Sequence, residues 1–211
     1  KSSIKKIYLA GRYLDEQVPQ LKRLKMYQNI KIFKNYELLP SKKNILLREK
    51  KILRILKLLF HKFEINKINY WIDRSSLLAI YRNQFFSEFS DVDISIDIRD
   101  YKKFSYILKK LSNKLIVEYK NIMIEKKKFK KYFITSSKKN IKLIEPVLID
   151  FIYRKLEKKK IISKGIKLKD IPLDFLKNRQ ICNYSGLKFY IPQNSKKYLK
   201  FIYGLKWKKK I

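Results

Sequence analysis

The chain has 211 residues, a length that fits one domain with a buried core. Hydrophobic residues make up 45% of the sequence, which indicates a globular protein rather than a disordered one. The net charge of +35 predicts attraction to polyanions, which include nucleic acid, an anionic membrane surface, and an anionic glycan or nucleotide. An alternative origin of this charge is an AT-rich genome, with lysine as the default surface residue.

Rare residue types exclude several kinds of site. Cys182 is the only cysteine, which excludes an internal disulfide and a cysteine metal cluster and favours a reducing, intracellular setting. His61 is the only histidine, and we interpret it as a packing residue, so neither a histidine base nor a zinc site of several histidines is supported. No run approaches the roughly 20 apolar residues of a membrane span, and we recognise no signal peptide.

The chain divides into two unequal parts. We assign residues 1–44 to an N-terminal extension without an assigned role, with a short strand at 7–9, and residues 45–211 to the main domain. In the main domain, apolar residues at helical spacing predict an amphipathic helix over 45–63. Its basic side either faces solvent, as such sides most often do, or binds anions.

A strand over 68–72 is predicted to turn at Ser75 and Ser76 into a helix over 77–82. The free N–H groups at a helix N-terminus suit a phosphate, and both serines add hydroxyl donors there. In the alternative interpretation Ser75 is an ordinary N-cap of this helix, a role that does not exclude contact with a phosphate.

Acidic residues follow this helix in a chain that is otherwise rich in lysine. Asp91 and Asp93 alternate with apolar residues over 91–96, so a strand with period two would point both carboxylates to one face. Two carboxylates about 7 Å apart on one strand face can share a divalent cation.

The rest of the chain predicts one helix, three strands and a final helix. The helix covers 101–111, the strands cover 114–119, 129–135 and 141–153, and the final helix covers 195–207. Together with the acidic strand, the three strands would form a mixed, largely antiparallel sheet.

Asp150 lies between two apolar residues of the last of these strands, near Asp91 and Asp93 in the predicted sheet. A carboxylate buried there without a partner would be costly. Two partners remain open for it: a metal ion, or one of the many lysines.

Several segments in the same order resemble the LicD/fukutin family of nucleotidyltransferase-fold phosphotransferases. The stretch at 70–82 matches the family pattern Tyr-Trp-Leu-Asp-x-Gly-Thr-Leu-Leu-Gly-x-x-Arg, and 91–93 matches its Asp-hydrophobic-Asp. The segment at 146–152 is similar to the strand that carries the family's third carboxylate. The tail at 171–204 is similar to the family's C-terminal signature, so the resemblance covers roughly residues 45 to 207.

The resemblance implies an α+β fold, a nucleotidyltransferase-like mixed sheet flanked by helices. It implies a transfer of a phospho-substituent, of the phosphocholine or polyol phosphate type, from a CDP-linked donor to a hydroxyl of a glycan or lipid-linked glycan. Such chemistry belongs to lipopolysaccharide or capsule biosynthesis. The expected location is cytoplasmic, with peripheral binding to the anionic inner face of a membrane.

The resemblance also assigns residues to roles. The expected catalytic residues are also the expected ligands of Mg²⁺ or Mn²⁺: Asp91, Asp93 and Asp150. The expected nucleotide or phosphate ligands are Asp73, Ser75, Ser76 and Arg82.

The chain departs from the family pattern at several positions. Ser75 and Ala79 replace glycines, Ser76 replaces threonine, and Phe89 replaces the first aspartate of the acidic run. These departures and the charge of +35 favour an alternative, a catalytically silent protein of the same fold that binds RNA or associates with the ribosome.

Overall fold

The computed structural model describes residues 42–88, 91–135, 147–157, 160–164, 170–175, 178–205 and 207–208. The predicted strand at 7–9 and the residue Phe89 lie outside these ranges. The first half of the described chain contains α3 (Lys42–Ile65), β1 (Tyr70–Ile72), α4 (Arg74–Arg82), the 3₁₀ turn η2 (Phe86–Glu88), β2 (Val92–Asp97), η3 (Ile98–Asp100) and α5 (Tyr101–Leu111). The second half contains β3 (Ile116–Ile124), β4 (Lys127–Thr135), β5 (Val147–Leu156), β6 (Lys160–Lys164), β7 (Ile171–Pro172), η4 (Leu173–Phe175), β8 (Arg179–Tyr184), β9 (Leu187–Pro192) and α6 (Ser195–Tyr203).

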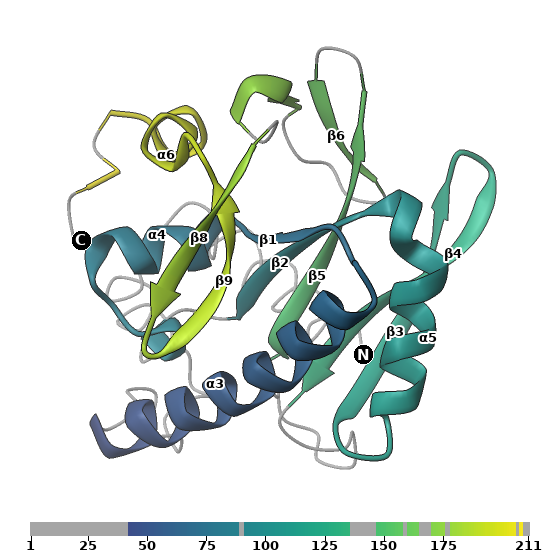
Figure 1. The fold of residues 1–211 in the computed structure, drawn as a ribbon, viewed down its shortest axis with the longest axis horizontal. Coiled ribbons are helices and arrows are strands. Elements are labelled where there is room, and N and C mark those ends of the chain that lie inside the picture. The colour runs from purple at the N-terminus through teal and green to yellow at the C-terminus, as the bar shows by residue number, and fades with distance from the viewer. Residues whose placement is uncertain are drawn as a thin grey trace, which may run out of the picture.

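Seven of the described strands form one mixed sheet. The order of the main path is β1-β2-β5-β4-β3, and β6 pairs with β5 and β7. Strands β2 and β5 are parallel, whereas the other neighbours in the sheet are antiparallel. This mixed sheet, flanked by helices, confirms the predicted α+β class (Figure 1).

Helices α3 and α5 lie over the same face of the sheet (Figure 1), and their apolar residues belong to the core. Both helices were predicted from their apolar spacing. Phe63 of α3 lies 5.9 Å from Phe104 of α5 between ring centroids, and Phe104 lies 4.9 Å from Phe151 of β5. Because successive side chains of a strand point to opposite faces, the neighbour of Phe151, Asp150, points to the other face.

The C-terminal part differs from the prediction. Strands β8 and β9 form a separate antiparallel hairpin that contacts β1, and the sequence analysis did not predict it. Helix α6 ends at Tyr203 instead of Trp207, because Gly204 adopts a φ of 78°, which is incompatible with continuing the helix.

No helix in the described part of the chain is both long enough and apolar enough to cross a membrane.

Candidate active site

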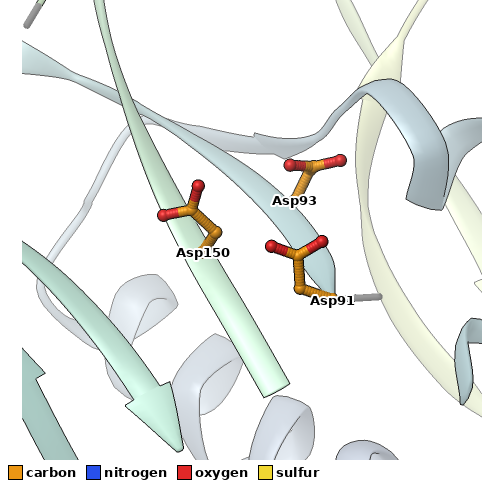
Figure 2. Close-up of side chains that lie close together, drawn as sticks. All are labelled: Asp91, Asp93 and Asp150. Atoms are coloured by element: carbon orange, nitrogen blue, oxygen red, sulfur yellow. The ribbon is translucent and has the colours of Figure 1, made fainter. Parts of the chain in front are cut away.

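Three predicted carboxylates converge at the start of the parallel pair β2 and β5. Asp93 of β2 and Asp150 of β5 are register partners, and Asp91 directly precedes β2. One carboxylate oxygen from each residue can be chosen so that the three atoms lie within 4.8 Å of one another. Figure 2 shows the three side chains gathered in one place above these two strands. The structure therefore brings together the acids that the sequence analysis grouped.

The electrostatics of this cluster favour a bound cation. Burial, followed by repulsion from Asp91, raises the pKa of Asp93 to about 8, against the opposing effects of Arg74 and Ser75. One oxygen of Asp150, Oδ1, is buried and accepts no hydrogen bond within the described residues. Hard divalent cations bind carboxylate oxygens, so the three residues fit a magnesium or manganese ion.

Ser75 and Ser76 both contact Asp93, but in different ways. The Ser75 hydroxyl donates to Asp93 Oδ2 at 2.6 Å, and the Ser75 backbone N–H donates to the same oxygen at 3.2 Å. The Ser76 hydroxyl instead accepts from the backbone N–H of Asp93 at 2.7 Å, and the residue is buried. Ser75 thus contacts the carboxylates directly, whereas Ser76 is buried and holds the β2 backbone, and its contact with phosphate stays a prediction.

Asp73 is a structural brace. Its carboxylate accepts from Arg154 Nη2 at 2.7 Å, from Ser95 Oγ at 2.6 Å and from the Tyr198 hydroxyl, and the residue is 0% exposed. Burial opposes its ionisation, but Arg154 and these hydrogen bonds outweigh burial and hold the pKa of Asp73 below its ordinary value. The structure thus places this carboxylate in a buried network behind the site, and the binding role of Asp73 stays a prediction.

Asp73 also takes the capping role that was considered for Ser75. It is the N-cap of α4, and its side chain accepts from the backbone N–H of Arg74 at 2.7 Å. The N–H of Ser75 is bonded to Asp93. The N–H groups of Arg74 and Ser75 are therefore already engaged by carboxylates, so a phosphate at this helix N-terminus would have to displace them.

Arg82 lies at the other end of α4, about 12 Å along the helix axis from its first residue. Its guanidinium donates to the backbone oxygen of Trp207 from Nε at 2.8 Å and from Nη2 at 2.6 Å. The structure does not bring this residue together with the carboxylates. Arg82 instead attaches the C-terminal segment to α4.

Arg74, which the sequence analysis did not single out, lies beside the carboxylates. It is the first residue of α4 and has a φ of 45°, a rare conformation for a residue with a side chain. Burial lowers its pKa, but the nearby acidic groups, of which Asp93 has the largest effect, together outweigh burial, so the pKa of Arg74 is raised. The only sequence signal was its place between Asp73 and Ser75 at the predicted turn.

Lys131 is a second basic residue of the site that the sequence analysis did not name. It lies on β4 and its Nζ is 2.8 Å from Asp150 Oδ2. The sequence left a metal ion and a lysine as alternative partners of Asp150, and the structure contains the lysine. Because Oδ1 has no hydrogen-bond partner among the described residues, this ion pair engages only one oxygen of Asp150.

A mixed sheet with carboxylates on adjacent parallel strands, next to a strand–turn–helix, defines the class of nucleotidyltransferase-type domains. The sequence model of the family described as LicD/FKTN/FKRP, nucleotidyltransferase domain, matches residues 67–194, more than half of the chain and all of the predicted site residues. The chain therefore belongs to this family, as its motifs predicted, and the family is of the phosphotransferase type. No curated protein matches the chain.

Proposed function

We propose that this chain is a metal-dependent phosphotransferase that moves a phospho-substituent from a CDP-linked donor to a hydroxyl of a glycan or lipid-linked glycan. The observation that carries the proposal is the convergence of Asp91, Asp93 and Asp150 on the face of the sheet opposite α3 and α5. Membership of the LicD/FKTN/FKRP family supports the same chemistry.

Phosphoryl transfer depends mainly on positioning and on neutralising negative charge. On this proposal Asp91, Asp93 and Asp150 hold Mg²⁺ or Mn²⁺, which when bound neutralises phosphate charge and activates the acceptor hydroxyl. Arg74 provides a further positive charge beside Asp93. Ser75 now gives two donors to Asp93, and these become available to a phosphate oxygen once Asp93 turns to a cation.

The proposed place of action is the cytoplasmic face of a membrane, in lipopolysaccharide or capsule biosynthesis. A net charge of +35 supports binding to anionic lipid or to an anionic lipid-linked acceptor.

Thermal unfolding with Mn²⁺ and CDP tests the proposal, because a ligand that binds only the native state raises the unfolding midpoint. We expect a midpoint rise with both ligands together in the wild type and none in Asp93→Asn. Asp174→Asn is the matched control, since Asp174 is an exposed acid of η4 and its variant should respond as the wild type does. The absence of a rise in the wild type with any cytidine nucleotide would contradict the proposal.

A second candidate function is binding of nucleic acid by a catalytically silent member of this fold. The net charge of +35 and the pairing of Asp150 with Lys131 favour it, because a lysine can replace a metal as the partner of this carboxylate. An RNA affinity that falls steeply with salt, together with no response to Mn²⁺ and CDP, would support this candidate.

A further inference from the structure

Lys131 forms a buried ion pair with one of the three carboxylates of the site. The Lys131 side chain is 3% exposed and the Asp150 side chain 13%. Phe133 of β4 is the register partner of Asp150, and Lys131 lies two residues before Phe133 on the same face of the strand. The ammonium group therefore approaches Asp150 from the β4 side, whereas Asp93 lies on the β2 side.

Two carboxylate oxygens of the site are already engaged by side chains of the protein. Asp150 Oδ2 accepts from Lys131, and Asp93 Oδ2 accepts two hydrogen bonds from Ser75. Asp150 Oδ1 is buried and has no hydrogen-bond partner within the described chain. A centre with two metal ions about 3.5–4 Å apart needs carboxylates that give oxygens to both ions. The arrangement around Asp150 leaves one oxygen for this purpose.

The basic side chains near the carboxylates also disfavour a second metal ion. Each carboxylate has a basic side chain close to it: Arg48 interacts electrostatically with Asp91, Arg74 with Asp93, and Lys131 with Asp150. Once a first cation has displaced the proton of Asp93, three positive side chains balance the three ionised carboxylates. A second divalent cation would then add positive charge that these carboxylates do not offset, which disfavours its binding.

We propose that Lys131 is a fixed cation of the metal centre, which holds Oδ2 of Asp150 and limits the centre to one divalent ion per chain. The inference rests on the proposed metal-dependent function and deepens it. Lys131 is a positioning residue in this role, because it acts through Asp150.

Titration of the full chain with Mn²⁺, followed by calorimetry and by electron paramagnetic resonance, tests this proposal. We expect one Mn²⁺ per chain in the wild type and two in Lys131→Met, with the spectrum of a spin-coupled pair in the variant. Lys130→Met is the matched control, because it removes one lysine from the adjacent position of β4, where Nζ lies 3.9 Å from the ring centroid of Tyr119. It should bind one Mn²⁺.

Three results would overturn the proposal. Two Mn²⁺ ions in the wild type would show that Lys131 does not limit the centre to one ion. The proposed function would still stand in that case if CDP raised the unfolding midpoint in the presence of Mn²⁺. No bound Mn²⁺ would remove both the inference and the metal-dependent function. Binding of a single Mn²⁺ with unchanged affinity in Lys131→Met would also refute the proposed role of Lys131. If the methionine variant does not fold, Lys131→Gln serves for the same comparison.

Discussion

Arg154 and Asp73 form a buried ion pair across 81 positions of the sequence, with 2.7 Å between Arg154 Nη2 and Asp73 Oδ2. Arg154 also donates to Ser95 of β2, which in turn donates to Asp73. The pair therefore ties β5 to β2 and to the turn that precedes α4. That turn carries Arg74 and Ser75, so the pair fixes the geometry of the site without contacting a ligand.

Removal of one partner of this pair should be strongly destabilising. Asp73→Asn removes the carboxylate that Arg154 Nη2 contacts, and we expect a loss of about 3–5 kcal/mol in the free energy of unfolding. Urea denaturation measures the change. Lys155→Met is the control, because the pair of Lys155 with Glu125 is exposed and solvent screens it. Equal effects of the two variants would refute the bracing role of Asp73.

The two serines should separate into a binding residue and a structural residue. Ser76→Ala leaves the buried N–H of Asp93 without its acceptor, so we expect a loss of about 1–3 kcal/mol in unfolding free energy. Ser75→Ala removes a donor at the site and should weaken binding of CDP with Mn²⁺ more than it lowers stability. Chemical denaturation and calorimetric titration of both variants measure these effects, and the reverse pattern would contradict the assignment.

Two arginines of α4 offer a matched comparison for phosphate binding. Arg74→Met should weaken binding of CDP in the presence of Mn²⁺ by on the order of tenfold or more, because it removes a charged donor beside Asp93. Arg82→Met loses the same charge at the far end of the helix and should leave this affinity unchanged. Calorimetric titration of both variants measures the two affinities. A larger effect of Arg82→Met would support the sequence-based prediction that Arg82 is a nucleotide or phosphate ligand.

The pH dependence of metal binding should follow the ionisation of the Asp93 carboxyl group. Its pKa is raised to about 8 in the folded chain without metal, so a cation must displace a proton from it below that pH. We expect Mn²⁺ affinity to rise with pH up to about 8, by at most about tenfold per pH unit. Titrations at several pH values measure this slope, and a flat profile below pH 8 would contradict it.

Without metal, the Asp93 carboxylate should make the folded chain less stable as pH rises, whereas its effect on metal affinity is an increase with pH. The unfolded chain releases this proton near the ordinary pKa of 3.8, whereas the folded chain keeps it until about 8. Between these values the folded state binds more protons, so the contribution of Asp93 to stability decreases as pH rises. Asp93→Asn should lack this contribution in pH-dependent denaturation without metal.

Local patterns were sufficient to predict the main helices and the acidic strand. The apolar spacing of α3 and α5 and the alternation around Asp91 and Asp93 depend only on neighbours in the chain, and the structure confirms these elements. The end of α6 at Gly204 was missed, because helical spacing alone does not show that this glycine takes a positive φ.

The partners of the charged residues were decided by tertiary structure. The sequence by itself determined the family, the acidic strand and the three carboxylates, because these follow from motifs and from the period of a strand. It did not determine that Arg74 and Lys131, rather than Arg82, lie beside them. The charged group at the end of a long side chain lies where packed neighbours place it, and those neighbours come from strands and helices distant in the chain.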